Sequence, residues 1–223
     1  MAQPEARREP PRDPLSKQRV LHAAVGLADR DGIESLTMRT LAHELGAGAM
    51  SLYYHVANKD ELLDGMVDVV YGEIDPPSGG ADWKTAVRRV AISAREALAR
   101  HRWAIPLMES RRRPGPASLR HHDAVLGCLR EAGFSIAGAV HAFSALDSYV
   151  HGFALQEQTL PFETPEELVE VGESMLRELP ADEYPYLAET IVEFMRSGYQ
   201  FANEFEVGLE LVLDGLERLR DPI

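Results

Sequence analysis

Cysteine, basic side chains and long apolar runs are all scarce in this chain of 223 residues. Because Cys128 is the single cysteine, the chain can form neither an intramolecular disulfide nor a zinc site built from several cysteines. The longest apolar stretch near the middle spans residues 132–146 and is too short to cross a bilayer. Residues 1–14 lack the apolar segment of a secretory signal. We therefore expect a cytoplasmic protein with no membrane partner.

Basic side chains are outnumbered, with 23 lysines and arginines against 36 aspartates and glutamates, which gives a formal charge of −13. The whole molecule repels phosphate, so any binding to nucleic acid must come from a local surface. Residues 1–72 hold 8 basic and 11 acidic side chains, whereas residues 73–223 hold 15 and 25. The N-terminal part is therefore the surface that repels DNA less, although an acidic face that merely aids solubility explains the same counts.

Helical spacing of apolar residues runs through most of the chain without a convincing strand run, so the sequence predicts an all-α fold. Ser16 is a plausible N-cap, and Asn58 with Glu61 predicts a capping box. Thr164, followed by Pro165, predicts another helix start. The expected helices are one after Ser16 that ends at Asp31, residues 38–45, residues 49–54, one from Asn58 to Pro76, residues 83–100, 117–132 and 135–158, one from Thr164, and residues 199–220.

The two short helices at residues 38–45 and 49–54 are joined by a tight glycine-bearing turn, which predicts a helix-turn-helix. Polar and aromatic residues on and just after the second helix can donate hydrogen bonds to a phosphate or a base edge; they are Ser51, Tyr53, Tyr54 and His55. Lys59 is expected in the first turn of the next helix, facing the same phosphate. Arg39 is the long side chain suited to a bidentate contact with guanine. A helix pair that only packs is the alternative.

Three segments of this region, residues 36–46, 51–56 and 58–63, resemble in one register the DNA-binding domain of TetR-family transcriptional regulators. Shorter motifs at residues 133–135 and 208–211 are similar to the tetracycline-repressor branch. The resemblance implies a regulator, by preference a repressor, that binds a palindromic operator in double-stranded DNA as a homodimer. The resulting set of candidate DNA contacts is Thr37, Arg39, Ala49, Met50, Ser51, Tyr53, Tyr54, His55 and Lys59.

The resemblance also implies a division of the chain into two domains. Residues 15–60 are expected to form an N-terminal three-helix helix-turn-helix domain, and residues 61–223 a larger helical domain for effector binding and dimerisation. The helix from Ser135 and the last helix are expected to pair with their symmetry mates. Residues 1–14, with four prolines and three arginines, are interpreted as a flexible arm. A tail without a function is the favoured interpretation. The alternative is a contact with DNA, because arginine-bearing arms can reach a minor groove.

The chain departs from the tetracycline branch at the start of the recognition helix. Gly48, Ala49 and Met50 offer no side chain able to hydrogen-bond a base, where that branch has polar ones. Base discrimination is then expected from small apolar contacts, for example to thymine methyl groups, together with Arg39. The operator sequence does not follow from these residues.

A second departure concerns the effector. The tetracycline branch binds its drug with magnesium, and by register the two metal-binding places fall on Met108 and Gln156. A thioether is a poor ligand for a hard cation, so we expect no metal, no cofactor and an effector other than magnesium–tetracycline. The hypothesis is a small, largely apolar effector of unknown identity in a cavity lined by Ile74, Val90, Ala94, Trp103, Met108, Val125 and Phe143. Ordinary packing is the alternative for each of these residues.

Other polar residues have ordinary interpretations beside the functional ones. His141 and His151 on the long helix could anchor a ligand, but a hydrogen-bonded interface histidine is the more common role. Residues 111–113, three arginines, could contact an anionic ligand or simply face solvent. No Gly-x-Ser-x-Gly, His-Glu-x-x-His or Walker motif occurs, so we expect no enzyme. A helical protein-interaction scaffold, or a small-molecule-binding protein without specific DNA binding, stays open.

Overall fold

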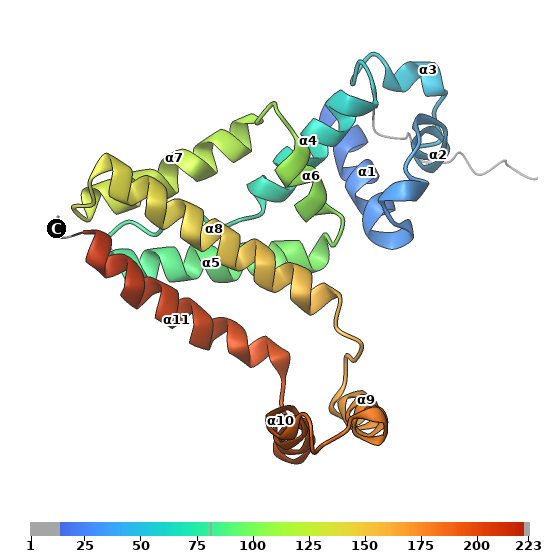
Figure 1. The fold of residues 1–223 in the computed structure, drawn as a ribbon. Helices are drawn as coiled ribbons and strands as arrows, with labels where there is room; N and C mark the ends of the chain where they lie inside the picture. Colours follow the sequence, from blue (N-terminus) through green and yellow to red (C-terminus); the bar gives the residue numbers. More distant parts are fainter. Residues whose placement is uncertain (1–13, 81, 221–223) are drawn as a thin grey trace, which may run out of the picture.

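The structure is a computed structural model that describes residues 14–80 and 82–220. Every regular element in these residues is helical, which confirms the predicted all-α fold (Figure 1). Of the helices in these ranges, none combines the length and the apolar character needed to cross a membrane. The arm expected at residues 1–14 lies outside the described residues apart from Pro14.

The N-terminal helices form a small unit at one end of the molecule, which we call the head (Figure 1). Ser16 caps the first helix as predicted, because its side chain accepts a hydrogen bond from the Arg19 amide at 3.2 Å. Gly46, with φ of 60°, adopts the left-handed conformation that the turn between the second and third helices requires. The elements are α1 (Lys17–Asp31), a 3₁₀ turn (Ile33–Ser35), α2 (Met38–Glu44), α3 (Ala49–Leu52) and the start of α4 (Lys59–Gly72).

The remaining helices form a larger unit, which we call the body. The long helix α8 runs along it and packs on α5, α7 and α11, whereas α9 and α10 form a hairpin that hangs from one end (Figure 1). The elements are α5 (Trp83–Arg100), α6 (Ala104–Ser110), α7 (Pro116–Glu131), α8 (Ile136–Gln158), α9 (Pro165–Glu178), α10 (Pro185–Ser197), α11 (Glu204–Leu216) and 3₁₀ turns at Phe201–Asn203 and Glu217–Leu219.

Several predicted helix boundaries are wrong. The second helix of the pair, expected at residues 49–54, is a single turn, and α4 ends at Gly72 and does not reach Pro76. The last helix begins at Glu204 and not at residue 199, because a 3₁₀ turn precedes it. The short helix α6, and α10 with its first-turn Pro185, did not stand out in the sequence.

The capping box predicted at the start of α4 is half right. The Asn58 side chain accepts from the Glu61 amide at 2.8 Å, as expected. The Glu61 carboxylate, however, accepts from the amide of Ala57 at 2.7 Å and not from Asn58 itself. It also binds Lys17 at 2.6 Å, so one carboxylate joins the start of α4 to the start of α1. Thr164 caps the start of α9 as predicted, and its capping box with Glu167 is complete.

Helix α4 belongs to the head at its start and to the body over most of its length. It packs on α1 and, more extensively, on α7. Asp68 near its middle accepts hydrogen bonds from the backbone amides of Ala117 at 2.8 Å and Ser118 at 2.9 Å, which caps the start of α7. The body therefore holds α4 through its backbone as well as through apolar packing.

A polar cluster around the buried rings of His101 and Trp103, which we call the latch, joins the head to the body beside α4. Asp29 in α1 accepts a hydrogen bond from the Trp103 indole N–H at 2.6 Å and lies 2.8 Å from Nδ1 of His101. The other ring nitrogen of His101 lies 3.1 Å from Glu73, just after α4. Because His101 is only 5% exposed, water cannot readily replace these partners.

Candidate functional site

The nine candidate DNA contacts lie at the cap of α2, on α2 and α3, in the turn after α3 and at the first residue of α4. None of them is buried. Tyr54 is 89% exposed, Met50 75% and Tyr53 44%, whereas Leu52 and Val56 are fully buried in the head. The candidate contacts therefore face solvent, whereas Leu52 and Val56 face the inside of the head. We call Thr37, Arg39, Ala49, Met50, Ser51, Tyr53, Tyr54, His55 and Lys59 the recognition set.

The basic members of the recognition set are available to phosphate. Within the described residues, neither Arg39 nor Lys59 forms an ion pair, in contrast with Lys17, which is paired with Glu61. Lys59 is the first residue of α4, where free backbone N–H groups favour an anion. Thr37 has a structural task that the sequence did not reveal, because its hydroxyl accepts from the Thr40 amide at 3.0 Å and caps α2.

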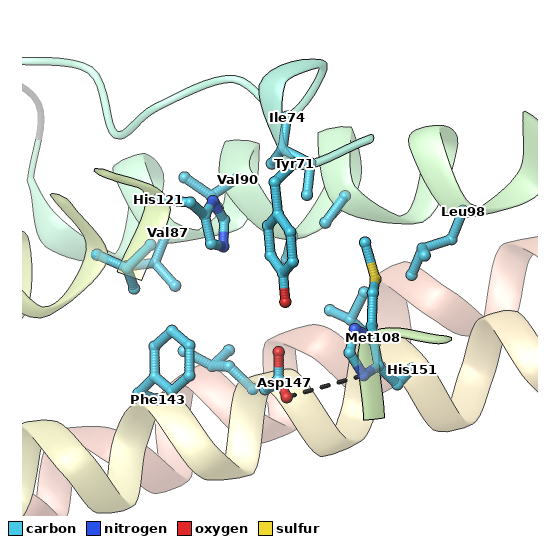
Figure 2. Close-up of a pocket in the computed structure, with 15 residues that line it drawn as sticks. Tyr71, Ile74, Val87, Val90, Leu98, Met108, His121, Phe143, Asp147 and His151 are labelled. Carbon is cyan, nitrogen blue, oxygen red and sulfur yellow. Dashed lines mark ion pairs between the residues drawn. The ribbon is translucent and has the colours of Figure 1, made fainter. Parts of the chain in front are cut away.

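A cavity with a free volume of about 50 Å³ lies in the body between the end of α4 and helices α5, α6, α7 and α8 (Figure 2). Six of the seven predicted effector contacts line it: Ile74, Val90, Ala94, Met108, Val125 and Phe143. Trp103 does not, because its indole points to Asp29 in the latch. The placement of Trp103 in the cavity was therefore wrong, whereas the binding of an effector by the other six stays a prediction.

Polar side chains at the cavity were missed by the sequence analysis. Tyr71, His121 and Asp147 line it, together with His151, which had been weighed as a ligand anchor. Figure 2 shows the Tyr71 hydroxyl pointing toward Asp147. Asp147 and His151 are four residues apart on α8, a spacing that places two ionisable side chains on one face of the helix and could have revealed them. His141, the other candidate anchor, is exposed on α8 and lies outside the lining.

Burial sets the protonation of these groups. Burial, reinforced by the charges of Asp147 and Glu109, raises the pKa of Tyr71 to about 12, so its hydroxyl is a hydrogen-bond donor at neutral pH. Burial, reinforced by the neighbouring histidines, lowers the pKa of His121 to about 4, so its ring is neutral. Burial also raises the pKa of Asp147, against the opposing effect of His151.

A group of three ligating side chains sits at one end of the cavity. Glu109, Asp147 and His151 each offer one donor atom, and these atoms lie within 4.8 Å of one another. Nδ1 of His151 is 2.9 Å from Glu109 and 3.7 Å from Asp147. The two places expected by register differ from this group: Met108 lines the cavity, whereas Gln156 is exposed and does not.

Two further polar features have structural explanations. Arg111 is not a loose loop residue, since its guanidinium lies 3.2 Å from Asp60 and 3.4 Å from Asp64 on α4. Burial, with the charges of Glu131 and Asp82, raises the pKa of the Cys128 thiol. A thiol with a raised pKa is a weak nucleophile at neutral pH, so nothing in its surroundings activates it for catalysis.

Comparison with known proteins agrees with this geometry. Residues 20–66 match the family described as bacterial regulatory proteins, tetR family, and residues 75–220 match the tetracyclin repressor-like C-terminal domain. The chain belongs to the TetR family. It is a helix-turn-helix transcriptional regulator, as predicted, and proteins of this family bind DNA and small-molecule effectors as dimers.

Three TetR-family relatives illustrate the likeness. An HTH-type transcriptional regulator of Saccharopolyspora erythraea is 34% identical over 91% of this chain and 84% of its own length. The HTH-type transcriptional repressor DrrR1 of Streptomyces coeruleorubidus is 34% identical over 94% of this chain and 80% of its own. The crystal structure of the Streptomyces coelicolor TetR family protein ActR in complex with actinorhodin is 29% identical, with a TM-score of 0.77, over 94% of this chain and all of that one.

Proposed function

We propose that this protein is a homodimeric repressor that binds a palindromic operator through the recognition set and is released by a small, largely apolar effector in the cavity. The head, residues 15–60, reads DNA, and the body, residues 61–223, binds the effector and the second subunit. The observation that carries the proposal is the course of α4. This single helix begins with Lys59 of the recognition set and ends at the cavity, to which it contributes Tyr71 and to which Ile74 follows closely.

The recognition set has the chemistry that duplex DNA requires. The tyrosine hydroxyls of Tyr53 and Tyr54 and the ammonium of Lys59 suit phosphate contacts, which position a protein on DNA. Arg39 suits a bidentate contact with guanine, and the apolar side chains of Ala49 and Met50 suit thymine methyl groups. Two such heads related by a twofold axis would contact major grooves one helical turn apart, about 34 to 36 Å.

The small cavity volume supports a coupling between effector and DNA. Pockets for drug-sized ligands have volumes of about 300 to 1,000 Å³, whereas this cavity offers about 50 Å³, so a ligand of that size would move its walls apart. Tyr71 and Ile74 are part of those walls and stand at the end of α4, a helix of 14 residues and therefore about 21 Å long. A displacement at this end is transmitted to the head, because α4 is continuous. The latch at Asp29 is a second connection between head and body, beside α4, and the head would rotate about it.

The surface of the body supports the dimer. Large apolar side chains of α8 and α11 are exposed in the single chain, among them Ile136 and Leu211 at 72%, Val207 at 58%, Val140 at 49% and Leu155 at 47%. Isolated chains rarely expose this much apolar surface on adjacent helices. Pairing α8 and α11 with the same helices of a second subunit would bury it in a four-helix bundle.

The relatives support the effector and the repression. ActR is a TetR-family protein of closely similar fold and was crystallised with actinorhodin, a small molecule. DrrR1 is named a transcriptional repressor. A ligand that shifts the DNA-binding equilibrium of such a protein by a coupling free energy of about 1 to 3 kcal/mol releases it from the operator.

Selection of bound sites from a random DNA pool by the full-length protein tests the proposal. We expect enrichment of a near-palindrome with half-sites about 10 base pairs apart. Tyr54→Ala should abolish or strongly reduce that enrichment, whereas Tyr186→Ala, which removes an equally exposed tyrosine from α10, should leave it unchanged. If no sequence is enriched, or if both variants behave alike, the chain fits the alternative of a small-molecule-binding or scaffold protein without specific DNA binding.

A further inference from the structure

We propose that the effector is an organic cation, a protonated amine on a largely apolar body, and that its charge pairs with Asp147 at the polar end of the cavity. This inference rests on the proposed function, because it assigns a chemical class to the ligand of the same cavity. It follows from the charges of the lining residues and from the contacts of Asp147.

The cavity offers an anionic ligand no permanently charged cation. Its lining residues, all of which the structure describes, include neither lysine nor arginine. The basic groups are His121 and His151, and His121 is neutral at pH 7 because burial lowers its pKa to about 4. A carboxylate or phosphate on a ligand would therefore enter an apolar site beside a carboxylate, without a fixed counter-charge, and would lose its hydration.

Negative charge is in excess at the polar end. Asp147 and Glu109 share the single imidazole of His151, so two carboxyl groups face one basic side chain. Glu109 has the closer contact, 2.9 Å, whereas Asp147 is 3.7 Å from the ring nitrogen, too long for a hydrogen bond. The Asp147 carboxylate therefore has acceptor capacity left for a ligand.

The surroundings of Asp147 favour a cationic partner. Its carboxyl is partly buried, with 37% of the side chain exposed, and burial raises the pKa because the charged form loses hydration. A cation placed beside the carboxylate would relieve this cost. A partly desolvated carboxylate in a cavity fits a binding site, because residues that serve binding are often kept at some cost in stability.

The remaining walls suit an aromatic or aliphatic amine. Tyr71 and Phe143 present rings to the cavity, and ring faces attract cations (Figure 2). Val87, Val90 and Val125 offer apolar contact to the rest of the ligand. The buried Nδ1 of His121 has no hydrogen-bond partner among the described residues, so a polar substituent of the ligand could bond to it.

Three probes with one naphthalene body and different charge test the inference: 1-naphthylmethylamine, 1-naphthalenemethanol and 1-naphthoic acid. Binding to the full-length protein is measured by isothermal titration calorimetry in buffer with and without EDTA. We expect the amine to bind at least about 10-fold more tightly than the alcohol, and the acid more weakly than both. If the acid binds as tightly as the amine, if none of the three binds, or if amine binding requires a divalent metal, the inference is wrong.

Variants identify the group responsible. Asp147→Asn keeps the shape of the side chain and removes its charge, so it should weaken amine binding by about 10- to 100-fold and leave alcohol binding unchanged. Asp123→Asn, an exposed carboxylate on α7 outside the cavity, is the matched control and should change neither. Equal losses for amine and alcohol in Asp147→Asn would show a packing role and overturn the inference.

Release of a labelled operator fragment is measured with the same probes, which separates this inference from the proposed function. If the amine binds through Asp147 but the DNA stays bound, the charge inference holds and the effector role of the cavity fails. If the protein selects an operator but the amine preference is absent, the DNA-binding function holds and the charge inference fails.

Discussion

The latch between head and body predicts a large effect from a single carboxylate. We consider Asp29→Ala, which removes the acceptor of the Trp103 indole N–H at 2.6 Å and the partner of His101 at 2.8 Å. Trp103 is 7% and His101 5% exposed, so the Trp103 indole N–H and Nδ1 of His101 lose their partner in a site that water reaches poorly, whereas Nε2 of His101 keeps Glu73. The substitution therefore removes two polar contacts and also leaves two buried polar atoms unsatisfied.

The magnitude follows from those two contacts. Hydrogen bonds to a charged group contribute about 1.5 to 3 kcal/mol each, and an unsatisfied buried partner costs a similar amount. The Asp29 side chain is 29% exposed, so solvent screens part of this interaction. We expect the free energy of unfolding to fall by about 2 to 4 kcal/mol. Asp29→Asn keeps one oxygen acceptor and should cost about half as much.

Urea unfolding followed by circular dichroism, at one fixed protein concentration because the chain is proposed to dimerise, measures the change. Asp31→Ala is the matched control on the same helix. Its carboxylate is 46% exposed and contacts Arg30 at 3.3 Å, so we expect a change below about 0.5 kcal/mol. A loss for Asp29→Ala no larger than that of the control would refute the structural role of the latch.

Three further predictions concern the dimer, the cavity and helix α4. Leu211→Glu places a charge on the exposed face of α11 and should make the protein monomeric by analytical ultracentrifugation, and a persisting dimer would contradict the assigned face. Lowering the pH from 6.5 toward 4 should lower the free energy of unfolding by up to about 1.4 kcal/mol per pH unit, because His121 binds a proton in the unfolded chain but stays neutral when it is buried in the folded protein. Denaturant titrations across this range should show a smaller decrease for His121→Gln. Gly115→Ala should destabilise the protein by about 1 to 3 kcal/mol in thermal unfolding, because the new Cβ would lie 2.2 Å from the carboxyl carbon of Asp68, whose carboxylate caps α7. Gly127→Ala is the control and should not destabilise the protein, because its Cβ would meet open space.

Local signals explain why much of the fold was predictable. Ser16 and Thr164 mark helix starts through hydrogen bonds within four residues of sequence, and α5 and α8 repeat apolar residues over many turns. The short α3 was harder, because one turn of helix gives no periodic pattern and its length depends on packing of Leu52 into the head. The hairpin of α9 and α10 shows the same limit, since Pro185 both interrupts the pattern and begins a helix.

The cavity was predictable only in its apolar part. Its six expected contacts are apolar residues that were proposed with the help of the family resemblance. Tyr71 and His121, in contrast, come from α4 and α7 and meet Asp147 only after those helices pack together with α8. Trp103 was expected in the cavity but lies outside it. A large aromatic residue was a plausible lining residue, yet its indole N–H donates to Asp29, a partner 74 residues away that sequence spacing cannot indicate.

The central claim is that the recognition set binds duplex DNA at a defined operator. Fluorescence anisotropy titrations of the selected operator at several salt concentrations test it most directly, for the wild-type protein and for Lys59→Ala. We predict that the logarithm of the affinity falls linearly with the logarithm of the salt concentration, and that Lys59→Ala weakens binding and reduces this slope by about 1, because one phosphate contact is lost. An unchanged slope and affinity in Lys59→Ala, or equal affinity for the operator and a scrambled duplex, would contradict the account.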